Sequence, residues 1–385
     1  MINKQLDQID TNDLNNLIEN GVSEKKTIEY KLTFSGDTDS DKKEFLGDIS
    51  SFANASGGDL IYGIKEVEGL PTQIVGVELQ NVDAAIRKYE NIIRDGLDPR
   101  IIFSTHTVRL DNGNIIFIFR INRSWIGPHR VIFKGHDKFY GRNSAGKYQL
   151  DTDELRAAFN LSQTLAEKIT RFRLDRIAEL SANTTPVPTF PAGAKVILHI
   201  IPFEAFSSSI QLDLSLIVQE SSKLPPMFSA SWTPRINLDG VITTAHSNKS
   251  YVQIYKNGII EAVDTGMLQP NESRPNTIPG QGYEERILRA FTSYWRLLRE
   301  FEVPPPFAIF LTLTGIRGYK ISSRTFDFDE ANEINQDNLL LPEKVVETFE
   351  ETPGKILKSI FDLVWNSCGI QKSPNFDEEG NWIAR

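Results

Sequence analysis

The chain has 385 residues, which is long for one hydrophobic core and predicts about two domains. It contains no run of about 18 apolar residues, and its first residues lack a basic-then-apolar signal pattern, so neither a membrane span nor a membrane partner is expected. The net charge of −9 argues against a nonspecific coat on nucleic acid, and the single cysteine, Cys368, excludes an internal disulfide and a cysteine-rich zinc site. We expect a cytoplasmic protein.

The first part of the chain predicts an α+β domain with a mixed sheet. The expected elements, in chain order, are a polar helix over 3–20, an alternating strand over 27–34, a helix over 41–55, an apolar strand over 59–64, a turn and short strand over 65–77, a helix over 82–97, a hairpin over 101–121, two short strands over 129–142 and a capped helix over 151–161. The "DNG" at 111–113 marks the turn of the hairpin.

The second part predicts another α+β domain without a repeat of the first. A helix with basic residues and the proline-rich stretch 181–193 separate the two domains. Strand-rich segments follow from residue 194, with helices near 283–301 and 354–367. The predicted organisation is an N-terminal helix over 1–20, a first domain over 21–160, a helix and linker over 161–192 and a C-terminal domain over 193–385.

Four charged residues of the first domain are candidates for chemistry. Glu29 and Lys31 share the polar face of the strand over 27–34, Glu24 precedes this strand, and Glu66 follows the strand over 59–64. If the two strands are neighbours, three carboxylates and one ammonium converge. Clustered carboxylates need a cation to stay ionised together, and Mg²⁺ or Mn²⁺ suits oxygen ligands. The alternative is that these are solvated charges at the edge of a sheet.

Five short motifs stand in order along the first domain. They are Glu29-Tyr30-Lys31, Ser51 to Gly58, Leu60 to Glu66, Gly76-Val77 and Tyr140-Gly141-Arg142. Together they resemble the Schlafen AlbA-2 domain family, once labelled divergent AAA-4. The resemblance covers residues 20–160 and implies a Schlafen/AlbA-2-like mixed sheet with helices, but it does not extend to residues 190–385.

The resemblance also implies a catalytic site. In nuclease members of the family, two acidic residues five positions apart are joined by a third that follows the glycine-containing strand. Glu24, Glu29 and Glu66 stand at these positions, where the third residue is usually aspartate. The resemblance therefore implies that these three glutamates are metal ligands and that Lys31 neutralises a phosphate.

A basic segment runs from Arg120 to Lys147. Its seven cations are Arg120, Arg123, Arg130, Lys134, Lys138, Arg142 and Lys147, and Asp137 is its one acid. His129 and His136 add possible hydrogen-bond donors, and Trp125, Phe139 and Tyr140 are interleaved. Such a segment is typical of a surface that holds a phosphate backbone, although alternating exposed strand positions produce the same pattern.

Two functions remain open from these residues. The first is a metal-dependent endoribonuclease that cleaves tRNA or another structured RNA, with a homodimer completing the groove and, by analogy with the family, a role in defence against phage. The second is a non-catalytic regulator that binds DNA or RNA. In either case the C-terminal domain is expected to bind a regulator or partner.

Overall fold

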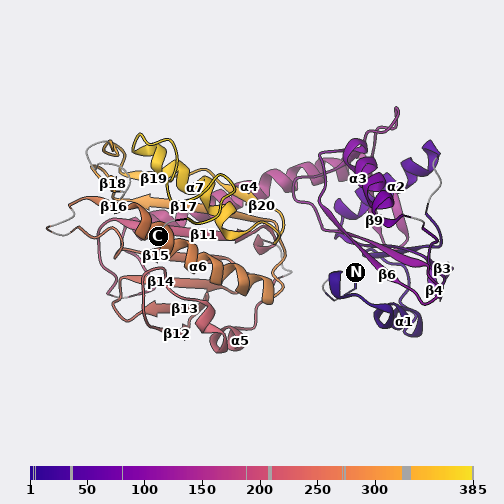
Figure 1. Ribbon diagram of the computed structural model, residues 1–385, viewed down its shortest axis with the longest axis horizontal. Helices are drawn as coiled ribbons and strands as arrows, with labels where there is room; N and C mark the ends of the chain where they lie inside the picture. Colours follow the sequence, from indigo (N-terminus) through magenta and orange to yellow (C-terminus); the bar gives the residue numbers. More distant parts are fainter. Residues whose placement is uncertain are drawn as a thin grey trace. The chain divides into compact units, whose positions relative to one another are not determined.

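The computed structural model describes residues 1–383 except residues 3, 5, 35–37, 80, 188, 207–209, 271, 273–274 and 323–330. The chain forms two compact units, Met1–Thr164 and Leu165–Arg385 (Figure 1). Both units combine helices with sheets, which confirms the predicted α+β class. The boundary between them falls inside helix α4 (Thr152–Ser181), a single helix where the sequence predicts two. Of the described helices, none has the length and apolar character needed to cross a membrane.

The main sheet of unit 1 is mixed, as predicted, and has the strand order β1-β2-β7-β6. Its strands are β1 (Ile28–Lys31), β2 (Gly58–Tyr62), β6 (Phe103–Arg109) and β7 (Ile115–Ile121). β1 and β2 are parallel, whereas β2, β7 and β6 pair antiparallel. The predicted hairpin over 101–121 is therefore confirmed.

Helix α2 (Asp39–Ala53) connects β1 to β2, because parallel neighbours need a crossover. Two glycines then return the chain to the sheet. Gly57 has a φ of +72°, and a Cβ atom on it would lie 2.7 Å from the carbonyl oxygen of Ile121. Only glycine fits this turn, which explains the "GG" between the helix and the strand.

The two faces of this sheet carry different side chains. Phe45, Phe52 and Leu60 belong to the core between the sheet and α2, whereas Ile28 and Tyr30 belong to the core on the opposite face. Helix α1 (Thr11–Glu19) also packs on that opposite face, so residues 1–20 are an integral part of unit 1. Since side chains alternate along a strand, Glu29 and Lys31 face α2.

A second sheet and a hairpin complete unit 1. The remaining elements are β3 (Ile64–Val67), β4 (Leu70–Ile74), α3 (Val82–Gly96), β5 (Leu97–Asp98), β8 (Arg130–Val131), β9 (Lys138–Asn143), β10 (Gly146–Gln149) and the short helix η1 (Leu6–Gln8). The second sheet has the order β10-β9-β8-β5, and β3 pairs with β4. β9 packs against α2, which brings the basic segment to the helix that flanks Glu29.

Unit 2 is built on an eight-stranded sheet with helices on both faces. The order is β12-β13-β14-β15-β11-β17-β19, with β20 also paired to β17. The strands of this sheet are β11 (Lys195–Pro202), β12 (Trp232–Ile236), β13 (Gly240–Ala245), β14 (Ser250–Tyr255), β15 (Ile260–Asp264), β17 (Phe307–Thr314), β19 (Asn338–Leu340) and β20 (Lys344–Val346). A separate parallel pair is formed by β16 (Thr277–Pro279) and β18 (Lys320–Ser322). The helices are α5 (Leu214–Gln219), α6 (Gly280–Glu300), α7 (Pro353–Ser367), η2 (Phe203–Phe206) and η3 (Ser221–Lys223).

The larger core of unit 2 lies between one face of this sheet and the helices α6 and α7 (Figure 1). Ile177 and Leu180 of α4 pack with Ile197 and Val263 on the other face. The predicted helices near 283–301 and 354–367 correspond to α6 and α7. Cys368, which follows α7, is a free, buried cysteine.

Candidate nucleic-acid interface

Glu29 and Lys31 lie together on the α2 side of β1. The Nζ atom of Lys31 is 2.9 Å from Oε1 of Glu29, and Arg142 of β9 donates a hydrogen bond from Nη2 to Oε2 of Glu29. Burial disfavours the charged form of Glu29, but the charges of Arg142 and Lys31 outweigh burial and lower the pKa of this carboxyl. Glu29 is thus bound both by Lys31, its neighbour on β1, and by a cation from the basic segment.

Asp48 is a fourth participant that the sequence interpretation missed. It lies on α2 and is 2% exposed. Its Oδ1 is 2.7 Å from Nζ of Lys147, and its Oδ2 is 4.0 Å from Nζ of Lys31. Burial and the nearby charge of Glu29 raise the pKa of Asp48. A signal was present, because Asp48 stands three positions after Phe45 and four before Phe52, on the apolar stripe of the predicted helix.

Arg142 is held on three sides. The residue is 4% exposed, and its guanidinium lies 4.1 Å from the centre of the Phe52 ring. Its Nη1 is 3.5 Å from Oγ of Ser51, while Nη2 binds Glu29. Arg142 therefore connects β9 to α2 and to β1, and its guanidinium is not presented at the surface.

Glu24 and Glu66 are both anchored at the β3–β4 turn, and Glu24 also contacts the backbone of β1 next to Glu29. The backbone N–H of Gly69 donates to Oε2 of Glu66 at 2.7 Å, and the backbone N–H of Glu24 donates to the carbonyl of Gly69 at 2.6 Å. Oε1 of Glu24 accepts a hydrogen bond from the backbone N–H of Tyr30 at 2.8 Å. Burial, followed by the charges of Glu29 and Glu66, raises the pKa of Glu24, so the three predicted carboxylates are electrostatic neighbours.

The fit of a divalent cation to these glutamates is incomplete as the side chains stand. The donor type is right, since carboxylate oxygens suit Mg²⁺ and Mn²⁺. However, both oxygens of Glu29 are engaged by Lys31 and Arg142. Within the described residues, no group of three or more His, Cys, Asp or Glu side chains is arranged to hold a metal ion. A cation shared by the three glutamates requires Glu29 to release one of its cationic partners.

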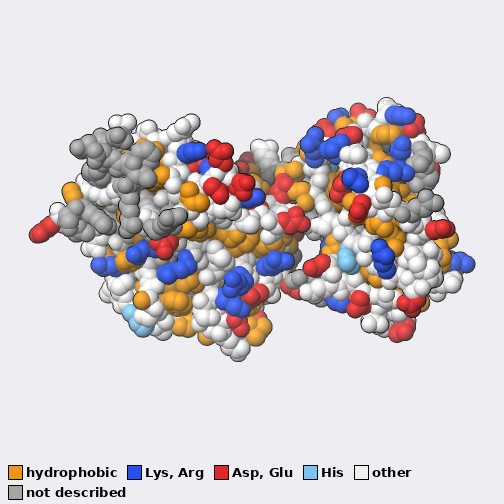
Figure 2. Space-filling model, in the orientation of Figure 1, with side chains coloured by type: hydrophobic (Ala, Val, Ile, Leu, Met, Phe, Trp, Pro, Cys, Tyr) orange, Lys and Arg blue, Asp and Glu red, His pale blue; other side chains and the backbone are white. Residues whose placement is uncertain are grey.

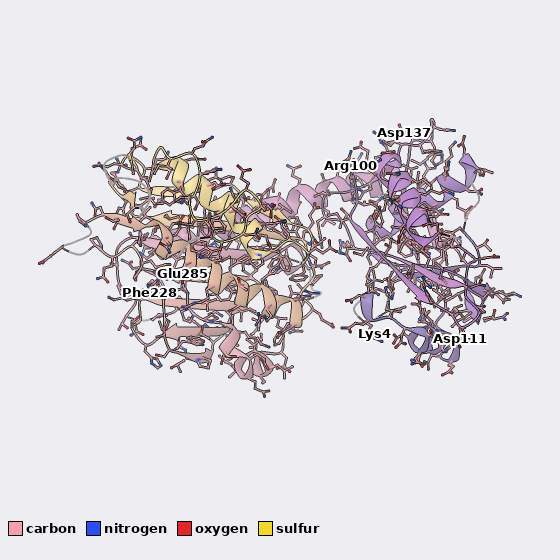
Figure 3. All side chains as sticks on the ribbon, in the orientation of Figure 1. Lys4, Arg100, Asp111, Asp137, Phe228 and Glu285 are labelled. Carbon is pink, nitrogen blue, oxygen red and sulfur yellow. The ribbon has the colours of Figure 1, made fainter. Side chains whose placement is uncertain are left out.

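Arg120, like Arg142, is engaged inside unit 1 rather than with the exposed cations of the basic segment. It pairs with Asp59 at 2.8 Å and donates to the carbonyl of Lys4 at 2.6 Å. Alternation along β7 places Arg120 on the α1 face with Ile118, opposite α2. Lys4 and Asp137, a partner of Arg130, are labelled at opposite ends of unit 1 in Figure 3.

Acidic residues from other segments pair with several of the remaining cations. Arg130 lies 3.3 Å from Asp98 and 3.1 Å from Asp137, and Lys134 lies 2.7 Å from Asp39. The excess of cations over acids within the segment therefore overstates the positive electrostatic potential at its surface. Arg123 has a different environment, because its guanidinium stacks on Trp125 at 4.0 Å. It lines a small recess with Asn54, Ala158 and Leu161.

A cationic cluster surrounds His136, which lies between β8 and β9. Burial, followed by the charges of Lys43, Lys138 and Lys147, lowers the pKa of His136. The His136 ring stacks on Tyr140, with 5.9 Å between ring centres, and its Nε2 is 2.7 Å from the Tyr140 hydroxyl. We call these five residues the His136 cluster. Figure 2 shows lysine and arginine side chains gathered on unit 1 over α2, α3 and β9.

Two basic residues of α4 are engaged within unit 2. Arg173 is buried in unit 2, where its guanidinium lies over the Phe310 ring and donates to Thr312. Arg176 forms two 2.8 Å hydrogen bonds with the buried carboxylate of Glu261. These two arginines therefore stabilise the packing of α4 on its own unit.

The comparisons with known proteins concern the same part of the chain. Residues 24–151 match the model of the family described as Schlafen, AlbA_2. No curated protein matches the chain. Among solved structures, the DIP2311 protein from Corynebacterium diphtheriae is 17% identical, with a TM-score of 0.25, over 33% of this chain and 22% of that one.

A second solved structure is the N-terminal domain of a RecG-related protein from Nitrosomonas europaea. It is 18% identical, with a TM-score of 0.26, and the match covers 34% of this chain and 85% of that one. The family match confirms the resemblance stated from the motifs and points to a function connected with nucleic acid. Residues 24–151 of this chain are therefore a domain of the Schlafen AlbA_2 family.

Proposed function

We propose that unit 1 binds the phosphate backbone of a nucleic acid, with RNA preferred over DNA, through the His136 cluster. The observation that carries this proposal is the convergence of Lys43, Lys138 and Lys147 around one histidine. These lysines come from α2, β9 and β10, so the fold concentrates positive charge that the net charge of −9 conceals.

The individual contacts support this assignment. Lys138 donates to the neutral amide oxygen of Gln149 at 2.9 Å, so its charge is not cancelled by that contact. Lys147 has the carboxylate of Asp48 on one side and the Tyr140 ring 5.7 Å away. Lysines neutralise phosphates, and an aromatic side chain provides a stacking surface for a base.

The test compares the full chain with two charge-removal variants and a control. Fluorescence anisotropy would measure binding to tRNA, single-stranded RNA and duplex DNA over a series of salt concentrations. Lys43→Gln and Lys138→Gln should each weaken binding, and each should reduce the slope of log K against log salt by about 1. Arg109→Gln removes an exposed charge from β6, outside the cluster, and should leave the slope unchanged. Equal slopes in all four proteins would contradict the proposal, as would the absence of binding to every probe.

We propose metal-dependent cleavage of the bound RNA, including tRNA, as a second candidate function. The supporting observation is that the charges of Glu29 and Glu66 both raise the pKa of Glu24, an effect that a divalent cation would relieve. Such an ion, when bound, stabilises negative charge that develops on a phosphate. Lys31 lies beside Glu29. It would position that phosphate once its ammonium group releases the carboxylates that it now contacts.

Cleavage is tested with wild type, Glu29→Ala and Glu66→Gln, each incubated with tRNA in Mn²⁺ or Mg²⁺. Glu68→Gln, an exposed change on the same turn, is the control. Loss of cleavage in Glu29→Ala and Glu66→Gln, with cleavage retained in Glu68→Gln, would support the nuclease. Binding by wild type without cleavage in either metal would leave a non-catalytic regulator of DNA or RNA.

We further propose that two copies of the chain form the complete groove. One His136 cluster offers a single cationic wall, and a second copy would supply the facing wall. Light scattering with and without tRNA tests this proposal. A protein that remains monomeric while binding tRNA at one-to-one stoichiometry would contradict it.

A further inference from the structure

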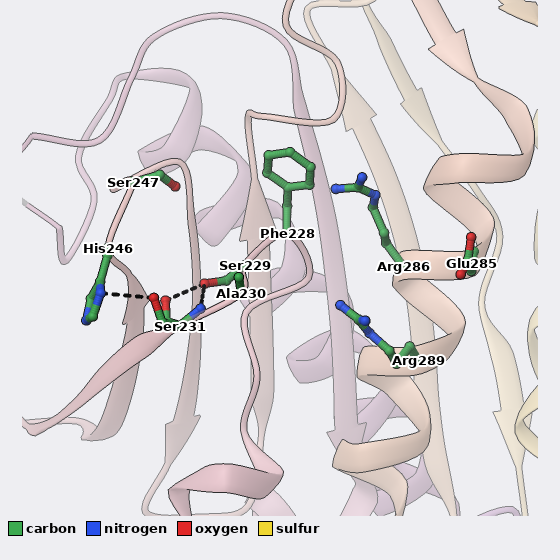
Figure 4. Close-up of a pocket in the computed structure, with 9 residues that line it drawn as sticks. All are labelled: Phe228, Ser229, Ala230, Ser231, His246, Ser247, Glu285, Arg286 and Arg289. Carbon is green, nitrogen blue, oxygen red and sulfur yellow. Dashed lines mark hydrogen bonds between the residues drawn. The ribbon is translucent and has the colours of Figure 1, made fainter.

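A pocket in unit 2 lies between the first half of α6 and the loop that precedes β12 (Figure 4). Its volume is about 590 Å³, within the range of small-molecule sites. The polar and aromatic side chains that matter here are Phe228, Ser229, Ser231, His246, Arg286 and Arg289. No residue of this pocket belongs to unit 1, so an inference about it does not depend on the proposed nucleic-acid function.

Two guanidinium groups dominate the chemistry of the pocket. Arg286 and Arg289 stand three positions apart on α6, which places them on one face of the helix. Figure 4 shows both side chains projecting toward the loop, whereas Glu285 is turned away from it. The described residues provide no ion-pair partner for Arg289 within 4.0 Å, so its charge is available.

The position of Arg286 is supported by an aromatic ring. Its guanidinium lies 4.1 Å from the centre of the Phe228 ring. Because this stacking holds the group before any ligand arrives, less conformational freedom is lost on binding.

The opposite wall is a network of hydroxyl groups. Oγ of Ser231 is 3.0 Å from Nδ1 of His246, and Nε2 of the same ring is 3.1 Å from the hydroxyl of Thr233. Oγ of Ser229 accepts a hydrogen bond from the backbone N–H of Ser231 at 3.1 Å. The loop is thus ordered by its own contacts, and it faces the arginines with hydroxyl groups and an imidazole rather than with carboxylates.

We propose that this pocket binds a small phosphorylated ligand, whose phosphate group is held between Arg286 and Arg289. A planar guanidinium donates two parallel hydrogen bonds to phosphate oxygens, and two guanidiniums three positions apart can share one phosphate. The chain contains no G-x-x-x-x-G-K-[ST] phosphate-binding loop, and the site needs none, because the donors are side chains of one helix. The ligand class is a phosphate ester or phosphate itself.

The experiment is isothermal titration calorimetry on the full chain at constant ionic strength. The probes are inorganic phosphate, AMP and ATP, each added to about 10 mM, which detects millimolar affinity. Binding of inorganic phosphate identifies the free anion as a ligand, whereas binding of AMP or ATP alone identifies a phosphate ester. No heat of binding with any of the three would overturn the proposal.

The variants are Arg289→Gln and Arg286→Gln, with Arg296→Gln as the matched control. Arg296 is an exposed arginine on the same helix and does not line the pocket. Arg289→Gln should lower the affinity roughly 10-fold or more, because a hydrogen bond to a charged group is lost, while Arg296→Gln should change it less than about 2-fold. Arg289 is exposed, so its variant should fold even if Arg286→Gln disturbs Phe228. Equal losses in Arg289→Gln and Arg296→Gln would overturn the proposal.

Discussion

Lys147 places its Nζ atom 2.7 Å from Oδ1 of Asp48, so a cation on β10 neutralises a carboxylate buried on α2. Burial and the charge of Glu29 raise the pKa of Asp48, and Lys147 opposes that shift. The same lysine is one of the three that surround His136. One residue therefore links the buried charges of unit 1 to the surface proposed to bind nucleic acid.

Removal of the Asp48 carboxylate should destabilise unit 1. In Asp48→Ala the ammonium of Lys147 loses its closest partner, and we expect the free energy of unfolding to fall by about 2–3 kcal/mol, less than for a fully buried pair because Lys147 can reach water. Urea unfolding followed by circular dichroism measures this change. Glu44→Gln removes an exposed partner of Lys31 and should cost less than about 1 kcal/mol. Equal losses in both variants would contradict a special role for the buried pair.

Glu29 and Arg142 should behave as a coupled pair. Arg142→Met leaves Glu29 with Lys31 alone, and Glu29→Gln leaves a buried guanidinium with one anion fewer. In the double variant neither charge remains, so its loss of stability should be smaller than the sum of the single losses by about 1–3 kcal/mol. The double-mutant cycle is measured by urea unfolding. Additivity within about 0.5 kcal/mol would show that the two side chains do not interact.

Binding of nucleic acid should take up protons at His136. The surrounding lysines and partial burial lower the pKa of this imidazole in the free protein. A phosphate among the same lysines would offset their charge and raise the pKa in the complex. Affinity should therefore increase as the pH falls through the pKa of the complex. Anisotropy titrations between about pH 5.5 and 8 measure this dependence. His136→Gln should lose it while retaining affinity at pH 8, and an identical profile in both proteins would contradict the assignment.

Asp264 should make the stability of unit 2 depend on pH. Burial raises the pKa of this carboxyl from 3.8 to about 7. A carboxyl whose pKa is raised binds its proton more tightly in the folded state than in the unfolded state. Its contribution to the free energy of unfolding is therefore full below the pKa of the unfolded state and is lost as the pH rises toward 7. Relative to Asp264→Asn, wild type should lose about 1.4 kcal/mol per unit of pH between roughly pH 4 and 7.

Tryptophan fluorescence during urea unfolding measures this difference, because Trp232, Trp295, Trp365 and Trp382 all belong to unit 2. Above pH 7 the difference in the free energy of unfolding between wild type and Asp264→Asn should become constant. A difference that does not change between pH 4 and 7 would show that Asp264 titrates normally.

Local patterns predicted the elements that carry the candidate site. Alternation along β1 correctly placed Glu29 and Lys31 on one face, and the "DNG" turn predicted the β6–β7 hairpin. Helical spacing predicted α2, and Gly57, in the Ser51 to Gly58 motif, forms the turn into β2. These features depend on neighbours within a few residues, which is the range that periodicity describes.

Pairing between distant segments could not be predicted in the same way. The cations after residue 120 look unpaired within their own segment, yet Asp39, Asp48 and Asp98 come to them from earlier segments. Arg120 follows the alternation of β7 to the opposite face, and the count of charges by segment ignored that alternation. The partner of a buried charge is a property of the tertiary fold, which one sequence does not reveal.

The ion pair between Glu29 and Arg142 can form only late in the synthesis of unit 1. The two residues are separated by 113 positions, so a nascent chain exposes the acidic strand well before its arginine leaves the ribosome. Until β9 docks on α2, the acids of β1 and α2 repel one another and the lysine surface is incomplete. A partly made chain, or a fragment that ends before residue 138, therefore lacks the assembled surface and should not bind the nucleic acid proposed as its partner.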